Sequence, residues 1–210
     1  MKKLIFIGVA IIFMSYNMNA QDSDSRDNLQ FGAKAGANYA NVYDTQGAEF
    51  KADPRLGLVL GGFLSIPIGR FIGIQPELLF SQKGFQGTGT ILGSPYSFTR
   101  TTNYLDIPIL FQLKASEQFT ILAGPQYSFL IKQSDVFSNA ILTTQQEQEF
   151  ANDNIRKNTL CFLGGLDVNF SNLVVGGRFG WDFMNNNGDG TSATPRYKNV
   201  WTQLTLGFKF

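Results

Sequence analysis

The stretch Val200–Phe210, which reads V-W-T-Q-L-T-L-G-F-K-F, decides the fold. Apolar side chains alternate along it with polar or small ones, the period of two that is typical of a β-strand with two different faces. One face contains Val200, Leu204, Leu206, Phe208 and Phe210, and the other contains Trp201, Gln203, Thr205, Gly207 and Lys209. If the apolar face meets lipid and the other face lines a lumen, this strand closes a transmembrane β-barrel by pairing with the first strand.

Seven further segments alternate in the same way, so we expect eight antiparallel strands. The other seven are Gln30–Ala40, Leu56–Ile66, Phe71–Lys83, Phe98–Lys114, Phe119–Ile131, Thr159–Phe170 and Leu173–Met184. Their connections alternate between long and short, and the long ones are Asn41–Arg55, Gly84–Ser97, Lys132–Asn158 and Asn185–Lys198. Outer-membrane barrels keep short turns in the periplasm and long loops outside. The pattern predicts an all-β fold, an eight-stranded antiparallel up-and-down transmembrane β-barrel of the cell outer membrane, with short periplasmic turns and long extracellular loops.

The N-terminal segment Met1–Ala20 has the features of a secretory signal peptide. Lys2 and Lys3 precede the apolar run Leu4–Met14, and Ala20 offers a cleavage point. The alternative, an uncleaved membrane anchor, needs about 20 apolar residues to cross a bilayer, and the run is shorter than that. We therefore expect a signal peptide at 1–20, a flexible periplasmic lead-in at 21–29 and a barrel domain at 30–210.

Composition excludes several classes of function. The chain has 17 basic and 16 acidic residues, and removal of the two signal lysines leaves 15 basic residues and a net charge of −1. Nucleic-acid binding needs a concentrated positive patch, so we expect no nucleic-acid partner. The single cysteine, Cys161, excludes an internal disulfide and is interpreted as a small packing residue on the inward face.

A set of charged residues is predicted to face the lumen. Its members are Lys34, Glu77, Asp106, Asp167, Arg178, Asp182 and Lys209. The interior of an eight-stranded barrel is just wide enough for side chains to fill it, and unpaired buried charges are costly. We therefore expect an internal network of salt bridges and hydrogen bonds that plugs the barrel. The alternative is a proton or ion path through the same residues.

Catalytic and metal chemistry find little support in the sequence. The chain has no histidine, which removes the usual general base. A carboxylate site made of Glu77, Asp106 and Asp182 is the alternative, but we predict no enzyme activity, no catalytic residue and no cofactor. Asn185–Gly190 resembles the start of a calcium loop, yet Arg196 occupies the twelfth position, where an acidic ligand is needed, so we predict no metal.

Aromatic residues near predicted strand ends suit the girdles that barrels place at membrane interfaces. The residues predicted for this role are Tyr39, Tyr104, Trp181 and Trp201.

Four segments have a distinctive sequence: F-G-A-K-A-G-A-N from Phe31, I-G-I-Q-P-E-L-L-F-S-Q-K-G from Ile72, Y-L-D-I-P-I-L-F-Q-L-K from Tyr104 and F-T-I-L-A-G-P-Q-Y from Phe119. Together with the closing Leu206–Phe210, they resemble the PorT-like outer-membrane β-barrel family of Bacteroidetes. The resemblance implies an eight-stranded barrel that is inserted by the outer-membrane assembly machinery. That machinery recognises a terminal aromatic, so Phe208 and Phe210 are the expected insertion signal. The family is named after a member that takes part in type IX protein secretion.

The function expected from these observations is a structural or interaction role in the outer membrane, as an accessory in envelope assembly or protein secretion. Its expected partners are outer-membrane lipid, the assembly machinery, and secretion or envelope proteins. One alternative is a narrow porin-like pore or transporter for small solutes. Another is a soluble, lipocalin-like ligand carrier, which would need an apolar interior.

Overall fold

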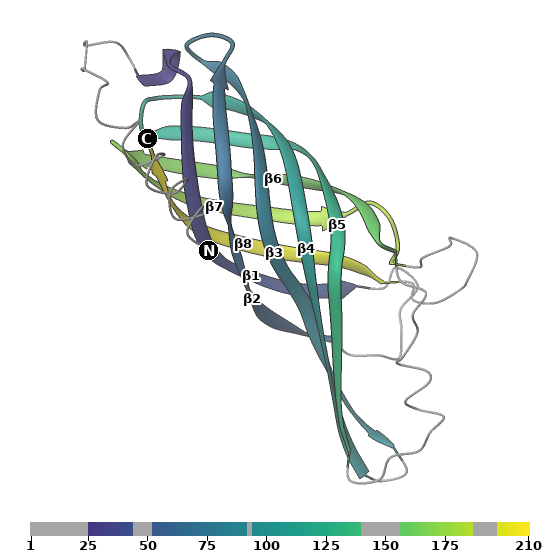
Figure 1. Cartoon of the computed structure of the whole chain (residues 1–210). Coiled ribbons are helices and arrows are strands. Elements are labelled where there is room, and N and C mark those ends of the chain that lie inside the picture. The colour runs from purple at the N-terminus through teal and green to yellow at the C-terminus, as the bar shows by residue number, and fades with distance from the viewer. Residues whose placement is uncertain (1–24, 44–51, 92–93, 140–155, 187–196) are drawn as a thin grey trace, which may run out of the picture.

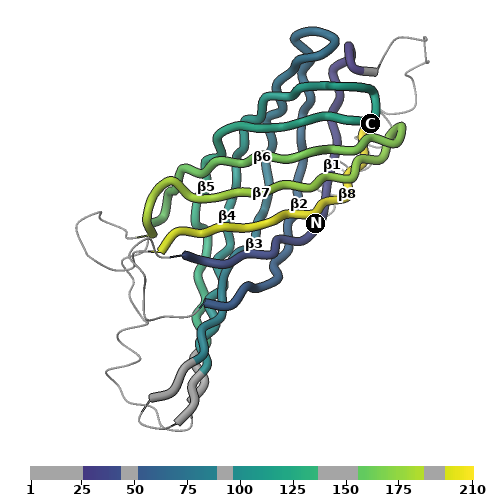
Figure 2. The backbone as a smooth tube through the Cα atoms, turned by 180° about the vertical axis from the view of Figure 1, so that it is seen from behind, coloured from purple at the N-terminus to yellow at the C-terminus, as the bar shows by residue number. Residues whose placement is uncertain are grey.

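The computed structural model describes residues 25–43, 52–91, 94–139, 156–186 and 197–210. In this part of the chain, eight antiparallel strands pair in sequence order and the last pairs with the first, which closes a barrel (Figures 1 and 2). A short 3₁₀ helix, η2 (Ser25–Asp27), precedes the strands. The strands are β1 (Gln30–Tyr43), β2 (Ala52–Pro67), β3 (Ile72–Ile91), β4 (Ser94–Lys114), β5 (Phe119–Asn139), β6 (Asn158–Phe170), β7 (Leu173–Asp182) and β8 (Lys198–Lys209). The predicted fold class is confirmed.

The seam between β1 and β8 closes the barrel, as the alternation in the last strand predicts. Ala33 lies opposite Phe208, and the pairing continues to Tyr43 opposite Lys198. The two backbones approach closely at Gly36, where an added β-carbon would lie 1.9 Å from a carbonyl oxygen of β8. Only glycine fits this position without a shift of the backbone.

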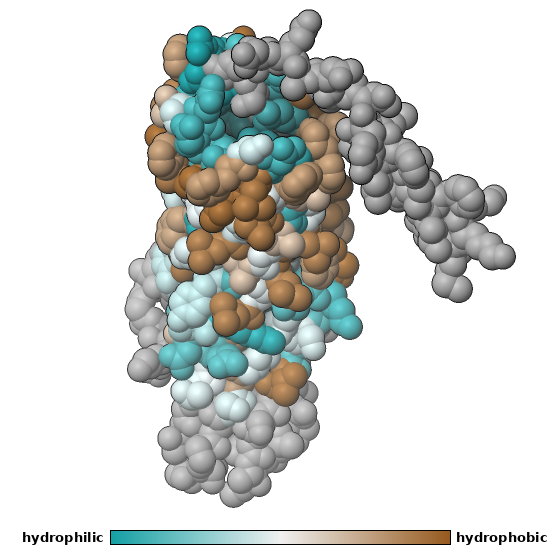
Figure 3. Space-filling view, turned by 90° about the vertical axis from the view of Figure 1, so that its left-hand side faces the viewer, coloured by the Kyte–Doolittle hydropathy of each residue, from teal (hydrophilic) through white to brown (hydrophobic). Residues whose placement is uncertain are grey.

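Apolar side chains lie on the outer face of the strands and polar side chains on the inner face, as the sequence predicts. On β8, Leu204 and Leu206 are exposed on the outer surface, whereas Gln203 is buried inside. Figure 3 shows the result on one face of the barrel, where hydrophobic residues cross the middle and hydrophilic residues lie at the upper end. Because a soluble barrel buries its apolar side chains instead, this arrangement counts against a lipocalin-like carrier.

Three short connections lie at one end of the barrel, which we call the turn end. They are residues 68–71, 115–118 and 171–172. β1 begins and β8 finishes at the same end, where the backbone N–H of Phe210 donates a hydrogen bond of 2.9 Å to the carbonyl oxygen of Phe31. Ser171 takes a positive φ of 54° in the two-residue turn between β6 and β7. We call the opposite end the loop end.

Three strands continue far beyond the barrel at the loop end (Figures 1 and 2). β3 has 20 residues and β4 and β5 have 21 each, against 10 in β7. We call the projecting sheet the blade, which comprises residues 84–91, 94–103 and 132–139. It begins where the strands are irregular: the β2–β3 register shifts between Pro54 and Val59, the β4–β5 register shifts between Asn103 and Tyr104, and Gly84 has a φ of 151°. Such irregularities bend and twist strands, so they redirect the blade away from the barrel wall.

The prediction of loops at Gly84–Ser97 and Lys132–Asn158 is wrong for most of the first and for the start of the second. Phe85 pairs with Arg100, and Arg100 pairs with Asp135, so these residues form regular strands. Alternating hydrophobicity marks a strand only where one face meets lipid, and a sheet in water needs no apolar face. β2 likewise begins at Ala52, inside the expected first loop. Residues 140–155 lie outside the described part.

The N-terminal segments are only partly described. Met1–Ala20, the predicted signal peptide, lies outside the described residues. The described end of the expected lead-in contacts the barrel, because Lys114 Nζ donates a hydrogen bond of 2.6 Å to the carbonyl oxygen of Arg26. The Arg26 guanidinium also lies 5.5 Å from the centre of the Phe71 ring. Within the described ranges, no helix is long and apolar enough to cross a membrane.

Candidate functional site

A cluster of four charged side chains crosses the lumen near the turn end, and we call it the belt: Lys34, Glu77, Asp167 and Arg178. Glu77 is its centre, because its carboxylate accepts hydrogen bonds from Lys34 Nζ at 2.5 Å and from Arg178 Nη1 at 2.7 Å. Arg178 Nη2 reaches Asp167 at 3.1 Å. Two cations and two anions therefore meet in one buried group with no net charge.

Neutral side chains extend the belt around the barrel wall. Gln75 Nε2 donates to Glu77 at 2.7 Å, and Gln112 Nε2 donates to Gln75 at 2.6 Å. Ser65 completes the chain by donating to Gln112 Oε1 at 2.8 Å. The connected side chains come from six of the eight strands, namely β1, β2, β3, β4, β6 and β7. On each of these strands they alternate with residues that face the lipid. A buried network whose members are paired in this way makes the interior rigid.

An apolar cluster lies in the lumen on the loop side of the belt. Its members are Ala40, Leu110, Leu122, Cys161, Leu163 and Trp201. On β6, for example, Cys161 and Leu163 follow the belt residue Asp167 toward the loop end. The cavity beside the belt measures only about 10 Å³, and the one at the turn end about 20 Å³. Each has room for about one water molecule, so packed side chains fill this part of the lumen.

Lys83 occupies a separate buried position on the loop side of the barrel. Its ammonium group lies 3.1 Å from Asp106 Oδ2. It also lies 3.7 Å from the centre of a Trp201 ring and 4.9 Å from that of Tyr104. A carboxylate and two aromatic faces together replace the water that the ammonium group loses on burial.

Asp182 lies in the same half of the lumen and is held by neutral donors. The Cys161 thiol donates to Asp182 Oδ1 at 3.0 Å, and Asn199 donates to Oδ2 through its side chain at 2.6 Å and its backbone at 3.2 Å. Cys161 is fully buried, as its interpretation as a packing residue requires. Its thiol connects β6 to β7 and has no access to solvent.

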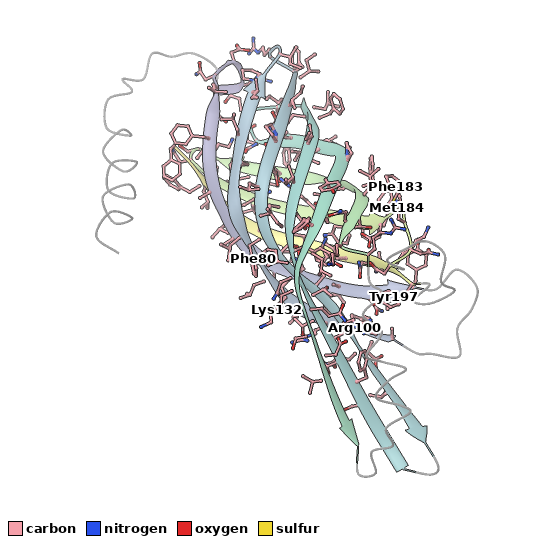
Figure 4. The ribbon with its side chains drawn as sticks, turned by 45° about the vertical axis from the view of Figure 1, so that its right-hand side comes forward. Phe80, Arg100, Lys132, Phe183, Met184 and Tyr197 are labelled. Atoms are coloured by element: carbon pink, nitrogen blue, oxygen red, sulfur yellow. The ribbon has the colours of Figure 1, made fainter. Side chains whose placement is uncertain are left out.

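A third polar cluster fastens the base of the blade to the barrel. Arg100 on β4 donates to both carboxylate oxygens of Asp135 on β5, at 2.8 and 2.7 Å, and to the Tyr197 hydroxyl at 2.6 Å. Figure 4 shows Arg100 and Tyr197 close together where the long strands leave the barrel. The Tyr197 ring packs on Phe85, which contacts Phe98 in turn. Burial raises the pKa of the Tyr197 hydroxyl, so it stays protonated and can accept the bond from Arg100.

The structure divides the seven charged residues that the sequence assigns to the lumen into separate groups. Lys34, Glu77, Asp167 and Arg178 meet in the belt, Asp106 pairs with Lys83, and Asp182 stands with Cys161 and Asn199. Lys209 is half-buried at the turn end and does not join the belt. Of the three carboxylates of the alternative catalytic site, Glu77 is engaged in the belt by Lys34 and Arg178. Asp106 and Asp182 both lie within electrostatic reach of Lys83, so the three do not form one site.

Two of the four predicted interface aromatics lie inside the barrel, so their prediction is wrong. Tyr104 and Trp201 are 2% and 1% exposed and flank Lys83. Tyr104 lies in the middle of β4 and only Trp201 lies near a strand end. Both face inward, two residues from Asp106 and Gln203 respectively. Tyr39 is exposed on the outer surface, and Trp181 is half-buried there against Phe162.

The predicted insertion signal lies on the outer surface of the closing strand. Phe208 and Phe210 are both exposed, and their rings contact each other at 5.4 Å. The Phe210 ring also stacks on Phe31 at 5.5 Å, across the seam. Recognition by the assembly machinery stays a prediction.

Sequence reasoning missed Lys83 and Arg100. Lys83 lies an even number of residues from Glu77 on β3, and Arg100 lies an even number from Asp106 on β4. Strict alternation of the two faces therefore assigns both side chains to the interior. Each stands next to a stretch whose composition predicts a loop, and this hides its place on a strand. The described residues contain no cluster of acidic, histidine or cysteine side chains that could hold a metal. Most of the calcium-like stretch, from Asn187 onward, lies outside them.

A closed antiparallel barrel with an apolar outer band and a polar, packed interior defines an outer-membrane β-barrel protein. The chain belongs to the outer membrane protein beta-barrel domain family, whose sequence model matches residues 19–187. The outer membrane is accordingly its location. Because outer-membrane barrels keep their short turns in the periplasm, we expect the turn end there and the blade outside the cell.

Solved structures of similar fold come from several bacteria. Ail, the attachment invasion locus protein of Yersinia pestis, is 12% identical, with 86% of this chain and 98% of that chain covered and a TM-score of 0.45. Neisserial surface protein A is 9% identical, with 87% and 99% covered and a TM-score of 0.48. OprG from Pseudomonas aeruginosa is 12% identical, with 90% and 99% covered and a TM-score of 0.44. No curated protein matches the chain.

Proposed function

We propose that this protein is an interaction barrel that does not conduct solutes and that presents the blade to a partner outside the membrane. The observation that carries the proposal is the outer edge of β5. Its pairing with β6 ends at Phe129 opposite Asn158, with one further hydrogen bond from Leu130 N to Lys157 O at 2.7 Å. Beyond that point, Lys132–Asn139 pairs with β4 alone among the described residues.

An edge strand with free N–H and C=O groups accepts another strand readily. Proteins use this mode of recognition when an extended peptide is added to a sheet, with backbone hydrogen bonds for affinity and side-chain contacts for specificity. Val136 is 61% exposed on this edge strand and offers such a contact. Arg100 holds the base of the strand through Asp135, so the edge is presented on a fixed support.

The packing of the lumen supports the interaction role over a porin-like pore. The belt neutralises its own charges, the apolar cluster lies beside it, and the cavities there hold about one water molecule each. A transporter for small solutes would need these side chains to move apart. Enzyme activity is not part of the proposal, because the chain has no histidine and its buried carboxylates are engaged by the cations and hydrogen-bond donors around them.

The class of partner follows from the resemblance to PorT-like barrels. Secretion or envelope proteins with an extended segment are therefore the partners to test first, and the role would be that of an accessory in their assembly. Lipid and the outer-membrane assembly machinery complete the expected contacts.

The test is co-purification from native outer membranes in mild detergent, with wild type and two variants compared. Val136→Lys places a charge on the edge strand, a device that natural proteins use to block strand addition. Ser97→Lys adds the same charge to an exposed position of β4, the central strand of the blade, and is the matched control. We expect a stoichiometric partner with wild type and Ser97→Lys, and its loss with Val136→Lys.

A lone barrel in the wild-type preparation, or equal retention by the two variants, would contradict the proposal. Wild-type protein in planar lipid bilayers gives the second readout. We expect no stepwise conductance, and regular conductance steps would favour the pore.

A further inference from the structure

A hollow of about 380 Å³ lies on the outer wall of the barrel near the periplasmic turns. Six of the residues that line it are aliphatic or aromatic: Ile68, Ile72, Phe111, Leu113, Ile121 and Ala123. Gly73 and Gln112 complete the lining. They come from the turn before β3 and from the turn-end halves of β3, β4 and β5. Since all of these strands are part of the apolar band, the hollow opens toward the hydrocarbon of the membrane.

The register of the strands explains why the wall is hollow here. Ala123 lies opposite Phe111 on β4 and opposite Gly164 on β6, so two small residues stand side by side next to a large ring. Ile121 pairs with Leu113, and Leu113 pairs with Ile72, which forms the border toward the turn end. The floor of the hollow is therefore low because the side chain of Ala123 is small.

Charged groups lie next to the hollow at the membrane boundary. Arg70 is exposed in the turn between Ile68 and Ile72, both of which line the hollow. The Arg26 guanidinium lies over the ring of Phe71, the next residue along that turn. Asp27 and Glu117 are exposed at the same end. Guanidinium groups are strong ligands for phosphate, and the mixture of both signs matches a zwitterionic headgroup.

We propose that this hollow binds an acyl chain of one phosphatidylethanolamine molecule of the periplasmic leaflet, with the lipid phosphate at Arg70 and Arg26. The acyl chain fits the apolar hollow, and the phosphate of the headgroup fits the cations at the turn where the hollow ends. The headgroup would then hold the turn between β2 and β3 at the membrane surface. The site lies at the opposite end of the barrel from the blade.

The experiment is native mass spectrometry of the full-length mature barrel in micelles, with dioleoyl phosphatidylethanolamine or dioleoylglycerol added. We expect wild type to retain one phosphatidylethanolamine molecule and to bind dioleoylglycerol, which lacks the phosphate, more weakly. Ala123→Phe fills the hollow with a ring, so the acyl chain loses its packing contacts there and lipid retention should fall measurably below that of wild type. Arg70→Gln should weaken retention of phosphatidylethanolamine and leave that of dioleoylglycerol unchanged.

The matched control is Ala35→Phe, which adds the same ring to an outward-facing alanine of β1, four strands away from β5 in the barrel. It should retain phosphatidylethanolamine as wild type does. Equal loss in Ala35→Phe and Ala123→Phe, or equal retention of the two lipids by wild type, would overturn the proposal. Heat-modifiable gel mobility establishes for each variant that the barrel has folded.

Discussion

The ammonium group of Lys83 on β3 lies 3.7 Å from the centre of a Trp201 ring on β8, inside the barrel. Asp106 approaches the same ammonium group from β4 at 3.1 Å. A cation on an aromatic face is worth about 2 kcal/mol when it is desolvated. This contact connects the closing strand to two strands that it does not pair with.

Replacement of Lys83 by methionine keeps the volume of the side chain and removes its charge. Asp106 is then left buried without its cation, so we expect Lys83→Met to lower the free energy of unfolding by about 3 kcal/mol. Urea unfolding in lipid vesicles measures this. The double variant Lys83→Met/Asp106→Leu should recover most of the loss, and a single variant as stable as wild type would show that the ion pair contributes nothing.

Arg178→Leu tests whether the belt supports the fold or carries ions. The substitution leaves Asp167 without its cation and Glu77 with Lys34 alone, so we expect an unfolding free energy about 3 kcal/mol lower and a lower unfolding temperature. Conductance in planar bilayers should stay at the wild-type level, because the apolar cluster remains. A variant that conducts at unchanged stability would identify an ion path instead of a plug.

Gly84→Ala tests the backbone at the base of the blade. An added β-carbon would lie 2.1 Å from the carbonyl oxygen of Arg100, and the φ of 151° is one that residues with side chains rarely adopt. We expect a loss of about 1–3 kcal/mol, measured by the same unfolding assay. Gly177→Ala is the control, since its nearest neighbour would be a Leu204 side-chain atom at 3.8 Å. Equal effects of the two substitutions would show that Gly84 is not constrained.

Ser171→Gly is expected to stabilise the barrel. Ser171 has a φ of 54°, a left-handed conformation that costs a residue with a side chain about 1 kcal/mol or more relative to glycine. The neighbouring Asn172 should respond in the opposite direction, because its side-chain amide donates a hydrogen bond of 2.9 Å to the carbonyl oxygen of Lys209. Thermal unfolding of Ser171→Gly and Asn172→Gly should therefore show a higher and a lower midpoint, and a lower midpoint for Ser171→Gly would be the contrary result.

The barrel itself could be predicted from the sequence because the membrane imposes one simple rule. Wherever a strand crosses lipid, every second side chain must be apolar, and Leu204, Leu206 and Phe208 show this directly. The same rule assigns Glu77 and Arg178 to the interior. It does not say which charges meet, because partners such as these two lie on strands that are far apart in the sequence.

The blade could not be predicted in this way, because the rule ends where the lipid ends. Thr88, Ser97 and Ser138 belong to paired strands, yet their composition is that of a loop. The prediction for the interface aromatics is wrong for a different reason. Trp201 stands near a strand end, as an interface residue would. Its place in the alternation of β8 decides whether its side chain faces the membrane or the interior, where it meets Lys83.

The seam between β1 and β8 has a consequence for biogenesis. Every other ladder of the barrel joins neighbours along the chain, whereas this one brings Ala33 to Phe208. Contacts of such long sequence separation form late and slowly. Until β8 pairs with β1, the backbone N–H and C=O groups at the open edges of these two strands have no partners. The charged interior is also exposed at this stage. A stalled intermediate would therefore be prone to aggregation and to proteolysis. Quality control of this barrel is therefore expected to act before closure, on the exposed edge of β1.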